Sequence, residues 1–167
     1  VINLASQSED ILKRSREFAF NTIDLASSIG SSYYSMHAGF LIDPNPKSLG
    51  KSLEISSLAD RKKCLSTFLD SVHIISEYAS SKSVTMLFEN NVLTKSNYQN
   101  FKDNPLLMVD IQESMSICEQ LPENSGLLLY VAHLNVSANT LGFDKVNYIE
   151  NLFPYIKGVH LSENNSI

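Results

Sequence analysis

The sequence contains no long hydrophobic run and very little cysteine. No apolar stretch approaches the ~20 residues that a membrane-spanning helix needs, and the first residues do not join a basic segment to an apolar one. We therefore expect a soluble protein that is not exported. The two cysteines, Cys64 and Cys118, fall within expected helices and lack metal-ligand spacing, which predicts free thiols in a reducing cytoplasm.

Positive charge is also scarce. Thirteen Lys and Arg residues stand against eighteen Asp and Glu residues, which gives a formal net charge of −5. The one basic run, Arg61-Lys62-Lys63, is typical of a solvated helix face. A surface that binds nucleic acid normally gathers basic residues on one side. The composition therefore argues against a nucleic-acid partner.

Glycine-rich loops for phosphates or dinucleotides are missing as well. No glycine-rich fingerprint follows any expected strand. Residues 49–52 (Leu-Gly-Lys-Ser) resemble the end of a phosphate-binding loop, but Asn45 stands where the first glycine belongs and no strand directly precedes it. We discard this motif, and the missing fingerprint weakens the case for an open dinucleotide-binding sheet.

The sequence does contain a repeated pattern of a helix followed by a strand. Apolar periodicity predicts helices over 9–29, 65–79, from 110 onward and over 144–153, and strands over 33–40, 84–88, 127–131 and 156–161. In the third helix, Asp110 is expected to cap the first turn while Glu113 reaches back to it. The strands are almost continuously apolar, which is typical of a parallel sheet covered by helices.

This pattern restricts the fold to an α/β class. An open doubly wound sheet and part of a β/α barrel both fit four consecutive helix-strand units. The chain has 167 residues, with 43% hydrophobic and 19% charged residues, which is typical of one globular domain. A complete eightfold barrel takes about 250 residues, so a barrel interpretation predicts an incomplete one.

Polar side chains recur where the expected strands end. His37, Glu89, His133 and His160 each lie at or just beyond the carboxyl end of a different strand, which is the end at which parallel β/α folds build their sites. Three imidazoles and a carboxylate suit a divalent ion such as Mn²⁺, Zn²⁺, Co²⁺ or Mg²⁺. One such histidine is usually structural, but the recurrence favours a shared site. The fourth histidine, His73, lies within a helix.

The motifs around these residues resemble those of the xylose-isomerase-like barrels. They are His-Ala-Gly at 37–39, Phe-Glu-Asn at 88–90, the run from 126 through 136–138 to 142–144, and His-Leu-Ser at 160–162. The resemblance extends over nearly the whole chain. This family includes sugar and sugar-phosphate isomerases and epimerases, and abasic-site nucleases of the endonuclease IV type. It implies a partial (β/α)8 TIM barrel, a single incomplete domain over 1–167 without the first two and last two strands.

The resemblance also implies a role for each strand-end residue. The implied metal ligands are Glu89, His133 and His160, and Glu89 is in addition the implied catalytic base. The implied substrate pocket contains His37, Asn91, Tyr130 and Glu163. In the nucleases of this family, the position of His37 binds a second metal ion.

Two features depart from the family pattern. Tyr130 stands three residues before His133, where the family has a metal-binding Asp, and a phenol with a reference pKa near 10 replaces a carboxylate poorly at pH 7. We expect the Tyr130 ring to be packed and its hydroxyl bonded. The family's last ligand, a Glu on the final strand, has no counterpart here. Glu163 is expected in a solvated loop rather than as its replacement.

Three functions remain open at this point. The first is a metal-dependent sugar or sugar-phosphate isomerase or epimerase that transfers a proton next to a carbonyl. The second is a barrel fragment without catalytic activity. The third is a metal-dependent phosphodiesterase acting on abasic DNA, which the acidic composition disfavours. For any of them, unpaired strand edges near 33–40 and 156–161 predict self-association into a homo-oligomer.

Overall fold

The computed structural model describes residues 1–48, 53 and 57–162, and its centre is a parallel β-sheet. The strands are β1 (Tyr33–His37), β2 (Thr85–Glu89), β3 (Ser125–Tyr130) and β4 (Ile156–His160). They pair in the order β1-β2-β3-β4, and each neighbouring pair is parallel. The structure therefore confirms the predicted strand order and direction, and with them the α/β fold class of a partial barrel.

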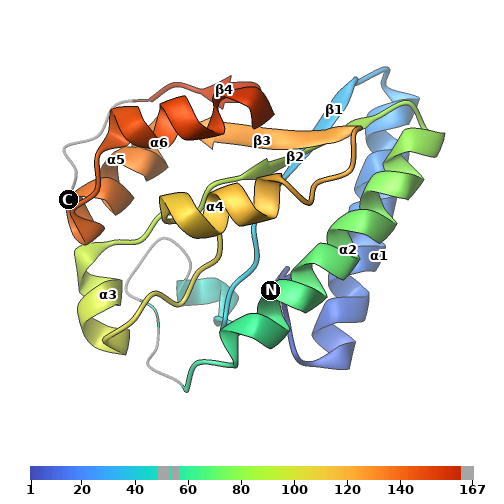
Figure 1. Cartoon of the computed structure of the whole chain (residues 1–167). Helices are drawn as coiled ribbons and strands as arrows, with labels where there is room; N and C mark the ends of the chain where they lie inside the picture. Colours follow the sequence, from blue (N-terminus) through green and yellow to red (C-terminus); the bar gives the residue numbers. More distant parts are fainter. Residues whose placement is uncertain (49–52, 54–56, 163–167) are drawn as a thin grey trace.

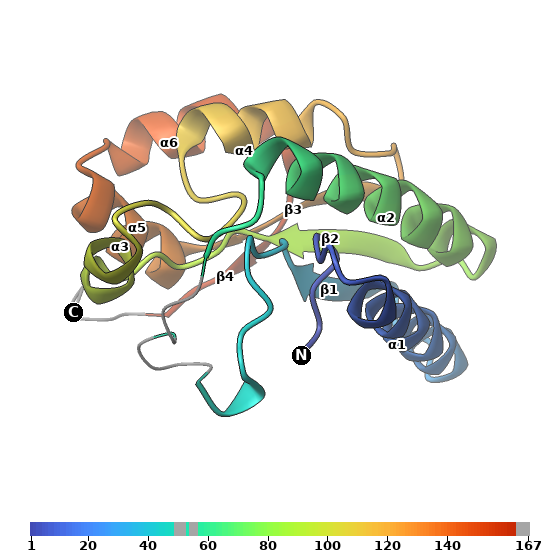
Figure 2. The same ribbon diagram turned by 90° about the horizontal axis from the view of Figure 1, so that it is seen from below.

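Helices connect the strands and cover the sheet (Figure 1). They are α1 (Glu9–Ser28), α2 (Arg61–Ser81), α3 (Lys95–Phe101), α4 (Ile111–Cys118), α5 (Val131–Leu141) and α6 (Lys145–Leu152), with short 3-10 helices η1 (Pro46–Ser48) and η2 (Phe153–Tyr155). Figure 2 shows α2, α4 and α6 along one face of the sheet, and α3 and α5 beyond the carboxyl ends of the strands. No described helix is long and apolar enough to cross a membrane.

Aspartate side chains begin three of the helices. The backbone N–H groups of the first turn donate to Asp60 in α2, to Asp110 in α4 and to Asp144 in α6, as expected for N-cap residues. Glu113 does not reach back to the cap as predicted. One oxygen of the Glu113 carboxylate lies 2.7 Å from the guanidinium of Arg61 in α2. The other oxygen accepts the N–H of Met108, in the segment before α4.

All four strands differ from the predicted ones at their carboxyl ends: β2 ends one residue later, at Glu89, and the other three end earlier. β1 ends at His37, and Phe40 pairs only in an isolated antiparallel bridge with Leu106. Val131 is the first residue of α5 rather than the last of β3, and β4 ends at His160. The two helices α3 and α5 were not predicted. Outside β2, the chain therefore leaves the sheet earlier than the apolar runs suggest.

The hydrophobic core lies between the sheet and the helices on its covered face. Its largest members include Phe68 of α2 and Phe88 of β2, whose rings meet edge to face with centroids 5.8 Å apart. Cys64 and Cys118 are buried and unbridged, which confirms the prediction of free thiols. His73 is exposed on α2, as expected from its place in a helix.

Candidate metal centre

The parallel register brings the predicted site residues to one end of the sheet. His37 of β1 pairs with Glu89 of β2, and Tyr130 of β3 pairs with His160 of β4. Each of these residues is the last of its strand. Because partners in register lie side by side, and parallel strands end at the same edge, the chain places these side chains on a common rim.

Glu89 is the centre of this arrangement. Its side chain is only 10% exposed, and three histidines contact its carboxylate. Oε1 lies 3.3 Å from Nδ1 of His133 and 3.6 Å from Nε2 of His37, while Oε2 lies 3.4 Å from Nδ1 of His160. The structure thus brings together all four strand-end residues that the sequence singled out.

His133 reaches the cluster from a helix rather than from a strand end. It lies just beyond the end of β3, as predicted, but in the first turn of α5, a helix that was not predicted. Its Nδ1 is 2.9 Å from the backbone oxygen of Asn90. A proton on Nδ1 that is donated to this carbonyl leaves Nε2 as the free lone-pair donor, an arrangement common among metal-binding histidines.

Asn90 is a positioning residue that the sequence interpretation missed. Its Oδ1 accepts the N–H of Tyr130 at 2.7 Å, its Nδ2 donates to the Tyr130 carbonyl, and its own carbonyl meets His133. These bonds join the ends of β2 and β3 at the point where α5 begins. The available signal was the polar pair Asn90-Asn91 directly after a buried strand.

Asn91 serves mainly as a structural bridge. Its Nδ2 donates to the backbone oxygens of Ala38, Gly39 and Leu107. The residue is buried, and it also lines the cavity beside the cluster. Its role in a substrate pocket stays a prediction, and the hydrogen bonds of its amide group hold the backbone after β1 and at Leu107.

Tyr130 packs between two of the histidines. Its ring centroid lies 4.0 Å from that of His133, and it meets His160 edge to face at 5.4 Å. The hydroxyl accepts a hydrogen bond from Ser162 at 3.2 Å. The ring is packed and the hydroxyl bonded, as expected from its chemistry. Glu163, the other predicted pocket residue in this region, lies outside the described residues.

The cluster opens into a cavity of about 1200 Å³. His37, Glu89, Asn91 and His133 contribute its polar wall, and apolar residues line much of the rest, among them Met36, Phe40, Leu106 and Val136. Among the described residues that line this cavity, Glu89 is the only acidic one. Neither His160 nor Tyr130 is in that lining, so His160 approaches Glu89 from outside the cavity wall.

The possible ligand atoms of three cluster residues lie close enough together to bind one ion. One ligand atom each from His37, Glu89 and His133 lies within 4.8 Å of the others. Among these contacts, Nε2 of His37 lies 3.6 Å from Oε1 of Glu89, close to the roughly 3.3 Å that separates two ligands held about 2.0–2.1 Å from a tetrahedral ion. The triad within mutual reach is His37, Glu89 and His133, whereas the predicted ligand set had His160 in place of His37.

Burial shifts the proton equilibria of the cluster toward neutral groups. It raises the pKa of Glu89, and the nearby His160 partly offsets that rise. Burial lowers the pKa of His37, and the charge of His133 lowers it further, against a hydrogen bond with Asn91. Burial also lowers the pKa of His133, against the bond to Asn90. Neutral imidazole is the form that binds metal ions.

These shifts predict how the stability of the metal-free protein depends on pH. His37 and His133 have lower pKa values when folded than when unfolded. As pH falls below about 6.5, the unfolded chain therefore binds more protons and stability is lost. Thermal unfolding in chelator should show a larger fall in midpoint from pH 7.5 to 5.5 for the wild type than for the His37→Gln/His133→Gln variant. Equal falls would contradict the assignment.

The parallel sheet, its covering helices and the polar cluster at the strand ends define a β/α-barrel type of protein with a candidate metal centre. Sequence comparison gives the family. A model of the xylose isomerase-like TIM barrel matches residues 1–166, and the chain belongs to this family. A comparison with curated protein sequences finds no match.

Solved structures with a similar fold include several sugar epimerases. A D-tagatose 3-epimerase-like protein superposes with a TM-score of 0.72 at 18% identity, over 99% of this chain and 54% of the other. An L-ribulose 3-epimerase gives 0.70 at 16%, over 97% and 47%. The 3-keto-D-glucoside 4-epimerase of E. coli gives 0.70 at 9%, over 96% and 55%. The chain thus spans about half the length of these structures.

Proposed function

We propose that this chain carries the metal-binding part of a sugar isomerase or epimerase, with Glu89 as its central ligand and proton-transfer group. The observation that supports this most directly is the contact of three imidazoles with one buried carboxylate at the rim of the sheet. Membership of the xylose isomerase-like family and the fold shared with sugar epimerases agree with it. The substrate would be a small sugar, free or phosphorylated.

The donor set of the cluster fits a divalent ion. Nitrogen donors from histidine and one carboxylate oxygen suit Zn²⁺, Mn²⁺ or Co²⁺, and Mg²⁺ less well because it prefers oxygen ligands. His37, Glu89 and His133 would hold the ion, with His160 at the other oxygen of Glu89. When bound, such an ion would act as a Lewis acid on a carbonyl and its neighbouring hydroxyl.

The protein groups then have distinct tasks. The raised pKa of Glu89 makes its carboxylate a better proton acceptor than an exposed one, which suits removal of a proton from the carbon beside a carbonyl. Asn90 keeps His133 turned toward Glu89. The apolar side of the cavity, which includes Met36 and Phe40, would limit the access of water to the reacting carbon.

A second candidate is a site that binds metal and sugar without turnover. Tyr130 favours it, because an aromatic ring packed on His133 takes the place of a carboxylate that the family pattern supplies. Epimerisation also needs a second group to return the proton on the opposite face, and Glu89 is the only acidic residue among the described residues lining the cavity.

Replacement of Tyr130 tests both candidates. We expect weak binding of Mn²⁺ or Zn²⁺ by the wild type, and tighter binding by Tyr130→Asp by about tenfold, or ~1.4 kcal/mol, because the new carboxylate adds a charged ligand. Titration calorimetry measures both affinities. Turnover should not return in this variant, since the second proton-transfer group is still missing from the cavity lining.

Tyr130→Asn is the matched control, because it removes the same ring and adds a neutral group of the shape of Asp. If Asn tightens binding as much as Asp, relief of packing is the cause and Tyr130 does not occupy a ligand position. If neither variant nor wild type binds a divalent ion at millimolar concentration, the proposed metal centre is wrong.

A further inference from the structure

A buried serine on α5 bonds to the segment that directly follows Glu89. The side chain belongs to Ser137, which is only 1% exposed. Its hydroxyl oxygen accepts the backbone N–H of Leu93 at 3.0 Å, and the hydroxyl donates to the backbone oxygen of Asn91 at 3.3 Å. One side chain of α5 therefore satisfies two backbone groups in the segment that leaves β2.

Ser137 lies one helical turn beyond His133. Residues four positions apart lie on the same face of a helix, so both side chains reach the segment after β2. His133 places its Nδ1 2.9 Å from the backbone oxygen of Asn90, and Ser137 bonds to the residues that follow. The face of α5 that carries His133 is thus held to residues 90–93 at two points, one turn apart.

Apolar packing alone does not fix the position of α5 along its axis. The other buried side chains of this helix are apolar: Ala132, Leu134, Val136 and Ala138. Apolar contact is non-directional, whereas hydrogen bonds require defined distances and angles. The N-cap of α5 makes no side-chain cap bond, and the helix contains no Lys, Arg, Asp or Glu. Its directional contacts with the segment after β2 therefore set where His133 lies.

The carbonyl partner of Ser137 belongs to a residue that also holds the end of β1. The amide group of Asn91 donates to two backbone oxygens directly after His37. Asn91 thus joins the segments that carry His37 and His133, two of the three residues whose ligand atoms lie within 4.8 Å of one another. A change at Ser137 is expected to alter the spacing of these two imidazoles.

We propose that Ser137 is a positioning residue of the candidate metal centre. It holds α5 so that Nδ1 of His133 stays on the carbonyl of Asn90 and Nε2 stays available for the ion. This inference rests on the proposed function, because it gives His133 the role of a ligand. Ser137 is not among the residues that line the cavity, so it acts through His133 rather than on a substrate.

The first measurement is the tautomer of His133 in the metal-free protein, read from the nitrogen NMR shifts of its ring at pH 7.5 in chelator. We expect the Nδ1–H form in the wild type, because the carbonyl of Asn90 accepts this proton. Ser137→Ala should move His133 toward the Nε2–H form, since α5 can then shift and the bond to Asn90 weakens. A serine with a purely structural role would lower stability without changing this signal.

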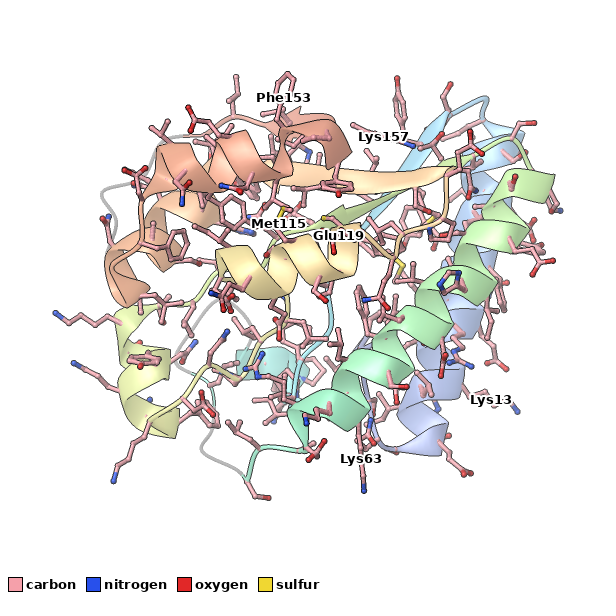
Figure 3. All side chains as sticks on the ribbon, in the orientation of Figure 1. Lys13, Lys63, Met115, Glu119, Phe153 and Lys157 are labelled. Carbon is pink, nitrogen blue, oxygen red and sulfur yellow. The ribbon has the colours of Figure 1, made fainter. Side chains whose placement is uncertain are left out.

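The second measurement is the affinity for Zn²⁺ by titration calorimetry. Ser137→Ala should weaken binding by about tenfold or more, as is usual when a group that orients a metal-binding imidazole is lost. Ser114→Ala is the matched control. Ser114 is fully buried in α4, the helix on which Figure 3 labels Met115, and its hydroxyl accepts a hydrogen bond from Tyr148. This control should lower the thermal midpoint and leave both the affinity and the His133 tautomer unchanged.

Ser137→Cys is a second variant for the case in which Ser137→Ala does not fold. It nearly keeps the side-chain volume and replaces the hydroxyl with a weaker hydrogen-bonding group, so both readouts should change in the same direction. A His133 tautomer that both variants leave as in the wild type overturns the inference, and so does an unchanged affinity for Zn²⁺. A wild type that binds no divalent ion instead contradicts the proposed function, and the tautomer in chelator still decides whether Ser137 positions His133.

Discussion

Glu89→Gln is expected to reduce the affinity for Mn²⁺ or Zn²⁺ at least about a hundredfold, or ~2.7 kcal/mol. Glutamine keeps the shape of the side chain and one oxygen donor, but it removes the negative charge at the centre of the three imidazoles. In an N/O site the charge of the ligands contributes much of the affinity for a divalent ion. Titration calorimetry of both proteins gives the ratio, or its lower bound where the variant shows no binding.

The same variant should not lose stability without metal. Burial raises the pKa of Glu89 above its ordinary value, so ionisation of this carboxyl group is less favourable in the folded state than in the unfolded chain. Removal of that charge is expected to leave the thermal midpoint in chelator unchanged or higher. Loss of metal affinity without loss of stability distinguishes a functional carboxylate from a structural one.

Glu113→Gln is the matched control for a buried carboxylate. Burial raises the pKa of Glu113 as it does that of Glu89, but Glu113 also pairs with Arg61 at 2.7 Å and accepts the N–H of Met108. Its neutralisation leaves the Arg61 charge without its counter-ion, so it should lower the thermal midpoint and leave metal affinity unchanged. If Glu89→Gln instead binds the ion as tightly as the wild type, Glu89 is no ligand and the proposed function should be abandoned.

The sheet could be predicted from the sequence because its strands are buried and nearly continuous in apolar residues. The helices α1 and α6 could be predicted because α1 shows strong apolar periodicity and α6 begins with an aspartate cap. α5 was not, since its N-cap Tyr130 makes no side-chain cap bond and Val131–Leu141 carries no charged residue to mark a solvent face. α3 was missed because only Asn97 is buried among its seven residues, so it shows no apolar periodicity.

The candidate site could be predicted as a set of residues but not as a geometry. Strand-end positions identified His37, Glu89 and His160, because parallel strands end at one edge. The sequence could not show that His133 lies in a helix or that the Asn90 carbonyl orients its ring. Nor could it show that His37, rather than His160, joins Glu89 and His133 in the group of ligand atoms within 4.8 Å of one another. These details depend on side-chain directions and on backbone bonds between distant segments.

Gly39→Ala is expected to destabilise the protein by about 3 kcal/mol, at the upper end of the range for overpacked sites. A Cβ on Gly39 would lie 2.3 Å from Cβ of Ala5 and 3.1 Å from its backbone nitrogen. That nitrogen donates to Oδ1 of Asn3, which also accepts the N–H of Phe40, so the Ala5 backbone is held in place. The glycine of the His-Ala-Gly motif thus permits two backbone segments to cross beside His37.

Two further variants separate this contact from other effects of removing a glycine. Ala5→Gly takes away the atom that the new methyl would meet, so the double variant Gly39→Ala/Ala5→Gly should be more stable than the sum of the two single changes predicts. Gly30→Ala has a left-handed backbone at φ +73° but no neighbour within 4 Å, and should cost only about 1 kcal/mol. Denaturant unfolding at pH 7.5 in chelator measures all four variants. If the changes in the free energy of unfolding at positions 5 and 39 are strictly additive, the contact between the two segments does not limit packing there. The requirement for glycine at position 39 would then have another explanation.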